Sequence, residues 1–218
     1  MYHQAIATLA LAEALAMTRD ARLDGPVRRA AAFIERAQQR GGGWDYGDSP
    51  TGRNDLSVTG WQLMALKSAH AAGIEVHWPV LFAALRRLAL MTQSTGHMTY
   101  ADRGTHAGRR GPGMAAVGFL CTQLLGWPRE SDLLIRQAEL LLKELPNWEI
   151  LSARDDPAHH LHTLYYWYHG TLALFQFGGQ AWDTWNTRLR DTLVFRQCRE
   201  GAERGSWDPP PSGFDSVG

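Results

Sequence analysis

Charged side chains are spread very unevenly over the eight segments of this sequence whose apolar residues recur with a helical period. Four segments are almost free of charge: His3–Met17, Leu56–Ala72, Gly113–Trp127 and Thr163–Gly178. Each is followed by a segment with one apolar and one charged face: Pro26–Gln39, Trp78–Thr92, Ser131–Leu145 and Ala181–Cys198. A helix that is apolar all round is buried, whereas an amphipathic helix covers a core with one face. The alternation therefore predicts an all-α fold of four helical hairpins, with inner and outer helix layers.

Small residues recur at equivalent places in the four uncharged segments. They are Ala7, Gly60, Gly118 and Gly170, and successive members are 52 to 58 residues apart. Self-similarity at a roughly fixed spacing is typical of repeat architectures. A small side chain at this place would let neighbouring inner helices approach each other closely.

The connections between the predicted helices differ in length according to their place. The three that lead from an outer helix to the next inner helix are long: Gly41–Asn54, Gln93–Pro112 and Pro146–His162. In an alternating arrangement all three lie on one rim, together with the N-termini of the inner helices. Because long loops in compact domains are commonly functional, we expect a binding site at this rim.

The composition is that of a globular protein and indicates no polyanionic partner. The chain has 218 residues, enough for a single domain over 1–218. Its 22 Lys and Arg balance 22 Asp and Glu, so nucleic acid is not an expected partner. The most apolar stretch, Thr163–Gly179, is shorter than the roughly 20 residues that span a bilayer, so no membrane span is predicted. The first residues lack the features of a signal peptide, which favours a cytoplasmic location.

The stretch Arg29–Trp44 resembles the QW motif of the terpenoid cyclase superfamily, which includes squalene-hopene cyclases, protein prenyltransferase β-subunits and complement thioester domains. The residues that match are Arg29, Ala30, Phe33, Ile34, Gln38, Gly42 and Trp44. Weaker copies comprise Gln93 with Gly96–Met98, Trp148 alone, and Gln197 with Gly205–Trp207. The resemblance implies an α/α toroid, in which the Gln and Trp brace the end of an outer helix against the next inner helix.

The resemblance also implies that the toroid is partial. A full toroid of this family has more helices than the eight predicted here, and the last motif copy stands where a further inner helix would follow. We therefore expect either a fragment of a longer toroid or an arc that a partner chain completes. Apolar inner surface left uncovered in the isolated chain would favour such association.

Asp55 immediately precedes an inner helix, a kind of position at which class II cyclases carry the acidic DxDD cluster that protonates an isoprenoid. Asn54 and Gly52 stand where the other two acids would be. Two roles are therefore open for Asp55, that of a catalytic acid and that of the N-cap of its helix. A carboxylic acid that protonates an alkene needs partners that raise its acidity, and their absence favours the N-cap.

Neither a metal site nor a cofactor is predicted. The prenyltransferases hold zinc with an Asp, a Cys and a His at inner-helix starts, and only His162 matches, because Val58 and Gly60 take the other places. One ligand of three does not form a zinc site. A solvated loop accounts for the neighbouring histidines and acids, which are Asp155, Asp156, His159 and His160.

Aromatic residues gather in the last uncharged segment. Inward-facing rings line the pocket of the family's cyclases, where their π-faces stabilise carbocations. The resemblance thus predicts a pocket lined by Trp61, Phe119, Tyr165, Tyr166, Tyr168 and His169, and core packing is the alternative. The second long loop adds a basic cluster that would receive an anion or else is simply solvated: Arg109 and Arg110, with Arg103, His97 and His106.

Two function hypotheses follow. In the first, the chain handles an isoprenoid or other lipid ligand in the aromatic pocket, and any acid catalysis starts from Asp55. In the second, it is a non-catalytic toroid that serves as an interaction or scaffold module. It lacks the Cys-Gly-x-x-Gln thioester of the complement domains, because Cys121 is followed by Thr122 and Gln123. The missing acids and zinc ligands favour the second hypothesis, whereas the aromatic helix favours the first.

Overall fold

The computed structural model describes residues 1–149 and 157–207, with side chains in the helix that begins at Pro157 described from Thr163 onward. The fold is all-α, as predicted, and no β-strand occurs in these ranges, only isolated bridges. The helices are α1 (Tyr2–Thr18), α2 (Ala21–Arg36), α3 (Leu56–Ala71), α4 (Trp78–Met91), α5 (Pro112–Leu124), α6 (Asp132–Leu142), α8 (Pro157–Phe177) and α9 (Gly179–Arg196). Each predicted helix is present. α2 begins earlier than its apolar pattern indicates, because Asp20 caps it by accepting a hydrogen bond from the Arg22 amide.

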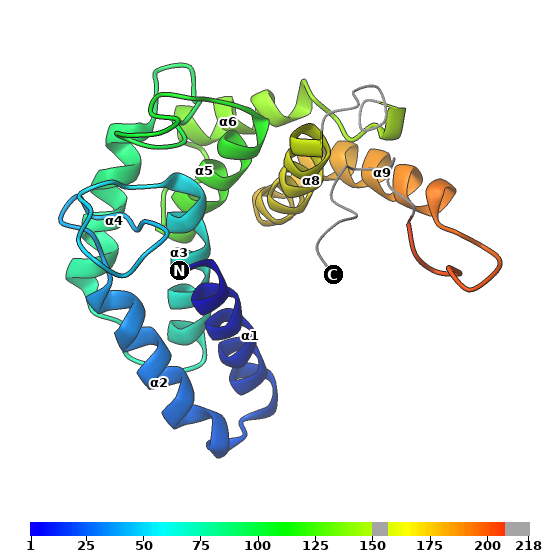
Figure 1. Cartoon of the computed structure of the whole chain (residues 1–218). Coiled ribbons are helices and arrows are strands. Elements are labelled where there is room, and N and C mark those ends of the chain that lie inside the picture. The colour runs from blue at the N-terminus through cyan, green and yellow to red at the C-terminus, as the bar shows by residue number, and fades with distance from the viewer. Residues whose placement is uncertain (150–156, 208–218) are drawn as a thin grey trace.

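The uncharged helices pack against one another in succession. α1 lies on α3, α3 on α5, and α5 on α8, while the charged helices α2, α4, α6 and α9 pack against them. Figure 1 shows these helices following one another around an open arc, from α1 and α2 to α8 and α9. α2, α4 and α6 bury apolar faces as expected, such as Val27, Ala31 and Ile34 on α2, whereas α9 fully buries Trp185 alone among its residues.

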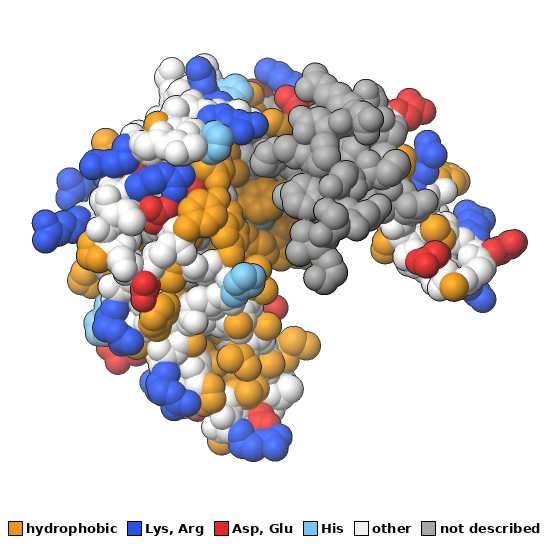
Figure 2. Space-filling model, in the orientation of Figure 1, with side chains coloured by type: hydrophobic (Ala, Val, Ile, Leu, Met, Phe, Trp, Pro, Cys, Tyr) orange, Lys and Arg blue, Asp and Glu red, His pale blue; other side chains and the backbone are white. Residues whose placement is uncertain are grey.

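Burial of the uncharged helices depends on their place in the arc. α3 and α5 each pack against two other uncharged helices and bury most of their residues. α1 exposes Ile6 and Met17, and α8 exposes Leu164 and Phe175. The prediction of burial on every side is therefore wrong for α1 and α8, because each packs against only one uncharged helix among the described residues. Figure 2 shows apolar side chains on the surface over α1.

The same backbone turn follows α2 and α4, and a longer loop closed by the same pair of backbone hydrogen bonds follows α9. After α2, the Gln39 amide donates to the Gly43 carbonyl at 2.8 Å, and the Gly42 amide donates back to the Gln39 carbonyl at 2.8 Å. Equivalent pairs of bonds join Gln93 with His97 and Gly96, and Cys198 with Ser206 and Gly205. The central glycines, Gly42, Gly96 and Gly205, have φ of 93°, 87° and 93°, a region that glycine enters without the strain of a Cβ atom. The turn is therefore a true internal repeat.

This repeat corrects the register of the second motif copy. Gln93 takes the place of Gln39, so that Thr92 stands where the first copy has Gln38. The Gln38 amide Nε2 donates to the carbonyls of Gly42 and Val80, both at 2.8 Å, and Gln197 makes the first of these bonds with Gly205. The shorter Thr92 hydroxyl instead donates within its own helix.

Tryptophan anchors the first and last copies of the turn. Trp44 Nε1 donates to the Ile34 carbonyl at 2.7 Å, and Trp207 Nε1 donates to the Leu193 carbonyl at 2.8 Å. The two environments differ, because Trp44 is fully buried whereas Trp207 is 42% exposed. Met98 fills this place in the second copy and is also fully buried.

Replacing Trp44 with Phe is expected to lower the free energy of unfolding by about 1–3 kcal/mol, because a buried carbonyl loses its donor. Trp207→Phe removes the same bond at a place that water reaches, so a loss under about 1 kcal/mol is expected. Urea unfolding of both variants, followed by circular dichroism, measures the difference. Equal losses would show that burial does not set the value of this bond.

Two of the repeated small residues have other neighbours than expected. A Cβ atom on Gly60 would lie 2.5 Å from Val117 of α5, so this glycine does let two inner helices approach. On Gly118 it would clash with Met98 in the loop after α4, and on Gly170 it would lie 2.8 Å from Trp185 of α9. The glycines thus accommodate whichever large side chain faces them.

Gly60→Ala is expected to destabilise the protein by about 1–3 kcal/mol through overpacking against Val117. Adding Val117→Ala removes the clashing methyl groups, so the double variant should be more stable than the sum of the two single losses predicts. Thermal or urea unfolding of the four proteins in this cycle provides the measurement. Strict additivity would contradict a direct contact between α3 and α5 at this point.

Candidate functional site

The two long loops that precede α3 and α5 lie side by side. The Leu56 amide donates to the Tyr100 carbonyl at 2.8 Å, and the Asp102 amide donates to the Asn54 carbonyl at 3.2 Å. Asn54 Nδ2 also donates to the Asp102 carboxylate at 2.7 Å. These two loops therefore share one rim, as predicted. The third long segment includes residues outside the described ranges.

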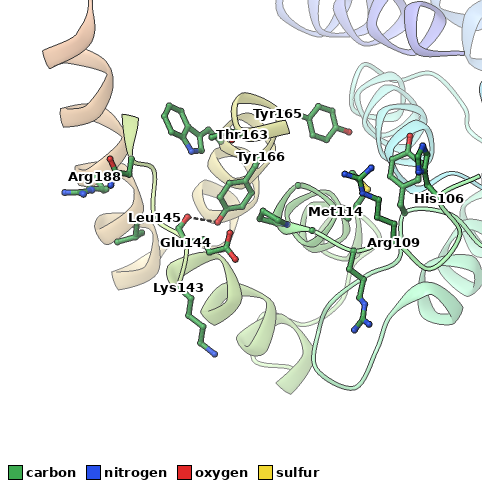
Figure 3. A pocket seen from close by; sticks show the side chains of 17 residues that line it. His106, Arg109, Met114, Lys143, Glu144, Leu145, Thr163, Tyr165, Tyr166 and Arg188 are labelled. Atoms are coloured by element: carbon green, nitrogen blue, oxygen red, sulfur yellow. Dashed lines mark hydrogen bonds between the residues drawn. The ribbon is translucent and has the colours of Figure 1, made fainter. Parts of the chain in front are cut away.

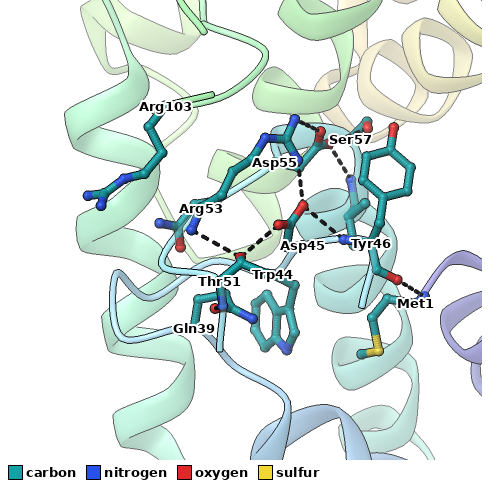
Figure 4. A network of polar contacts seen from close by, with 12 residues as sticks. Met1, Gln39, Trp44, Asp45, Tyr46, Thr51, Arg53, Asp55, Ser57 and Arg103 are labelled. Atoms are coloured by element: carbon teal, nitrogen blue, oxygen red, sulfur yellow. Dashed lines mark hydrogen bonds and ion pairs between the residues drawn. The ribbon is translucent and has the colours of Figure 1, made fainter. Parts of the chain in front are cut away.

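Asp55 is the N-cap of α3, which confirms that interpretation. Its Oδ1 accepts from the Val58 amide at 3.1 Å and from the Ser57 hydroxyl at 2.5 Å, and its Oδ2 accepts from Arg53 at 2.8 Å. Figure 4 shows Arg53 bridging Asp55 to a second carboxylate, that of Asp45. The Asp55 side chain is fully buried. Both of its oxygens are thus occupied by donors of the protein itself.

Three tyrosines surround this carboxylate and arginine network. Tyr2 donates to the Ser57 hydroxyl at 2.5 Å, and the hydroxyls of Tyr46 and Tyr100 bond to each other at 2.5 Å. The Arg53 guanidinium lies over the rings of Tyr46 and Tyr100, 5.7 and 5.9 Å from their centroids. Burial raises the pKa of Tyr2 and Tyr100 above the usual range, so both phenols stay protonated.

A pocket of about 870 Å³ opens beside this network, between the N-terminal ends of α5 and α8 and the C-terminal end of α6 (Figure 3). Three consecutive aromatic residues of α8, Tyr165, Tyr166 and Trp167, contribute to its lining. The other lining residues are Tyr100, His106, Arg109, Arg110, Gly111, Pro112, Gly113, Met114, Lys143, Glu144, Leu145, Asn147, Thr163 and Arg188. Asp55 is not one of them, so the buried carboxylate does not open onto this pocket.

The two tyrosines of the aromatic wall differ in the hydrogen bonding of their hydroxyls. The Tyr166 hydroxyl donates to the carbonyls of Leu141 and Glu144, both at 3.0 Å, and so ties α8 to the end of α6. The Tyr165 hydroxyl is buried and has no hydrogen-bond partner. A buried hydroxyl without a partner costs free energy unless a ligand or water satisfies it. Burial raises the pKa of Tyr165, so this hydroxyl retains its proton.

The pocket brings together some of the predicted ligand-binding residues and separates others. Tyr165, Tyr166, Arg109 and Arg110 line it. Phe119 does not: it is fully buried and packs against Phe177, with ring centroids 5.4 Å apart. Core packing, the alternative considered for the aromatic residues, therefore describes Phe119.

Trp61, Tyr168 and His169 form a second aromatic cluster, between α3 and α8. The rings of Trp61 and Tyr168 are stacked with centroids 5.6 Å apart, and His169 meets Trp61 edge-on at 5.3 Å. His169 Nδ1 lies 3.0 Å from the Tyr165 carbonyl, a contact that makes Nδ1 the donor. Its Nε2 is buried and has no partner. Burial lowers the pKa of His169 to about 4, so the ring is neutral at physiological pH.

The lining residues that the sequence reasoning missed include Lys143, Glu144, Trp167 and Arg188. Trp167 lies within the aromatic run already noted, so its position could have been inferred. The other three come from the end of α6 and from α9, which read as ordinary charged faces of outer helices. Only the packing of α6 and α9 beside α8 brings them to the pocket.

In the described part of the chain, no group of three or more His, Cys, Asp and Glu side chains is placed to hold a metal ion. The side chains of Asp155, Asp156, His159, His160 and His162 lie outside the described residues. Among the described helices, none has the length and hydropathy needed to cross a bilayer.

Comparison with known proteins adds no relative. No protein-family model, no curated protein and no solved structure matches this chain. The resemblance to the terpenoid cyclase superfamily therefore remains one of motif residues alone.

His169→Phe is expected to make the protein less sensitive to acid. The unfolded chain takes up a proton at this histidine near pH 6.5, whereas the folded chain does so only near pH 4. The contribution of neutral His169 to the free energy of unfolding is therefore complete above pH 6.5. It is lost as the pH falls toward 4, by about 3 kcal/mol in total. Urea unfolding at intervals from pH 7.5 to 4 measures the slope for the wild type and the variant.

The control is His70→Phe, because His70 is exposed on α3. It should retain the acid sensitivity of the wild type. If His169→Phe lost stability with falling pH as steeply as the wild type, His169 would not be held neutral by burial.

Proposed function

We propose that this chain is a partial α/α-toroid domain of the terpenoid cyclase and prenyltransferase type, and that it holds an isoprenoid or another apolar ligand in the pocket beside α8. The observation that carries the proposal is the pocket of about 870 Å³, whose α8 wall consists of Tyr165, Tyr166 and Trp167. Apolar and aromatic walls with a few placed polar groups are typical of small-molecule sites.

The motif interactions support the family assignment. The resemblance implies that the Gln and Trp of each copy brace the end of an outer helix. Gln38 bonds to the turn after α2 and to α4, and Trp44 bonds back to α2. The last copy repeats the main features with Gln197 and Trp207. The succession of uncharged helices, each covered by a charged one, is the layering that a toroid requires.

Catalysis by protonation is not part of the proposal. The one acid that the resemblance assigns to this role, Asp55, caps α3 and pairs with Arg53. Donors of the protein itself bind both of its oxygens, so neither oxygen is free to approach a ligand. The function supported best is therefore binding and presentation of the ligand.

A second candidate, an interaction module, is favoured by the outer surface of α4. Trp78, Phe82 and Leu90 are 72%, 62% and 74% exposed on this helix. Large apolar side chains gathered on one exposed helix are typical of protein–protein contacts. Such a contact is compatible with ligand binding, because α4 contributes no residue to the pocket.

The ligand-binding proposal is tested with the full chain and farnesol, a neutral isoprenoid alcohol. Met114 lines the pocket, so Met114→Trp should fill it and weaken farnesol binding at least tenfold. Met17→Trp is the matched control, because Met17 is 85% exposed on α1 and should leave binding unchanged. Isothermal titration calorimetry gives the affinities, and native mass spectrometry with lipid extraction identifies any apolar ligand that the purified protein retains.

Two results would overturn the proposal. One is the absence both of a retained lipid and of farnesol binding by the wild type. The other is farnesol binding that Met114→Trp leaves unchanged, because the ligand would then occupy another place. Association of the wild type that Phe82→Asp abolishes would support the interaction module instead.

A further inference from the structure

The charges around the pocket are strongly unbalanced. Four cationic side chains line it, Arg109, Arg110, Lys143 and Arg188, whereas Glu144 is the one carboxylate among the described residues that line it. This imbalance is local, because the whole sequence carries equal numbers of acidic and basic residues. A concentration of one sign of charge in a concave site raises the local concentration of ligands of the opposite sign.

The four cations keep their charge available to a ligand. None of them forms an ion pair with a described carboxylate, in contrast to Arg53, Arg87 and Arg103 of the neighbouring loops. Arg110 donates to the neutral Gln93 amide oxygen at 2.8 Å, and Arg188 donates to the Pro146 carbonyl at 3.2 Å. These bonds orient the guanidinium groups without neutralising them.

Two further features of the pocket favour an anion. The N-terminal end of α5, at Gly111–Gly113, lines the pocket, and no side chain caps it. The free amides of a helix N-terminus carry partial positive charge. The buried Tyr165 hydroxyl supplies a donor that has no acceptor within residues 1–149 and 157–207. Figure 3 shows Arg109 on one side of the pocket and Lys143 and Arg188 on the other, with Tyr165 and Tyr166 between them.

Apolar side chains accompany these donors. Met114, Leu145 and Trp167 line the same pocket, together with the ring faces of Tyr165 and Tyr166. A small polar anion would leave this apolar surface without a partner, and a neutral hydrocarbon would leave the four cations without one. A ligand that satisfies both has an apolar chain and an anionic head.

We propose that the pocket binds amphiphiles that carry a single anionic head, a carboxylate or a phosphate, on an apolar chain. This inference rests on the proposed ligand-binding function and specifies its ligand class. The head lies beside Arg109 and the N-terminal end of α5, in the field of Lys143 from across the pocket, and the chain lies against the aromatic wall of α8.

The test uses four probes with the same twelve-carbon chain: dodecanoate, dodecyl phosphate, dodecanol and dodecyltrimethylammonium. Isothermal titration calorimetry is performed on the full chain with each probe below its micelle concentration. At least one anionic probe is expected to bind ten or more times as tightly as dodecanol, and the cationic probe more weakly than dodecanol. The ratio between dodecanoate and dodecyl phosphate identifies the preferred head. Raising the salt concentration should weaken the anionic probes selectively.

Charge-removing variants locate the head. Arg109→Gln and Lys143→Gln are each expected to weaken the preferred anionic probe three- to tenfold and to leave dodecanol unchanged. Arg40→Gln is the matched control, because Arg40 is exposed near the end of α2 and does not line the pocket. It should change no affinity.

The outcomes separate this inference from the function on which it rests. If dodecanol and farnesol bind as tightly as the anionic probes, the head-group inference is overturned and ligand binding stands. If no probe binds, both are overturned. If the anionic probes bind best but Arg109→Gln, Lys143→Gln and Arg40→Gln all behave like the wild type, the head does not lie at this rim and the inference fails.

Discussion

The side chain of Asn54 connects most of what positions the candidate site. Its Oδ1 accepts from the Gly43 amide at 2.8 Å, in the turn that ends the first repeat. Its backbone amide and Nδ2 both donate to Asp102, at 2.9 and 2.7 Å, in the loop that leads to α5. Asp102 in turn pairs with Arg87 of α4 at 3.1 Å. Because Asn54 is fully buried, each of these bonds must be satisfied for the loops to pack. One residue thus fixes two loops and the starts of two inner helices.

The same rim separates two kinds of polar chemistry. Around Asp55 every donor has an acceptor within the protein, which makes that network a brace for the N-terminal end of α3. Around the pocket the balance is reversed, because four cations and the Tyr165 hydroxyl have no anionic partner among the described residues. A closed network stabilises a fold, whereas an unbalanced one favours a ligand. The proposed binding function therefore lies at the N-terminal end of α5 rather than at the acid that the sequence singles out.

Features that depend on interactions between residues close in the sequence were predicted better than features that depend on long-range contacts. The helices, the glycine turn after Gln39 and the N-cap at Asp55 depend on residues close in the sequence, and all were predicted. The register of the second turn was not predicted. The sequence aligned Gln93 with Gln38, but the backbone hydrogen bonds of the turn show that Gln93 is equivalent to Gln39. Of the predicted aromatic set, only Tyr165 and Tyr166 line the pocket, because Tyr168 and His169 lie about one helical turn further along α8, where they pack against Trp61 of α3.

The sequence by itself determined the helical fold, the alternation of uncharged and amphipathic helices, and the turn built on Gly42 and Trp44. Periodicity and turn chemistry are local, so they can be inferred without coordinates. The tertiary structure alone decided which charges share a space. Lys143 and Arg188 belong to outer helices, yet the bonds from Tyr166 and Arg188 to the segment after α6 bring them to the pocket that Arg109 also lines. These charged side chains are brought together by long-range packing, which cannot be inferred from their spacing in the sequence.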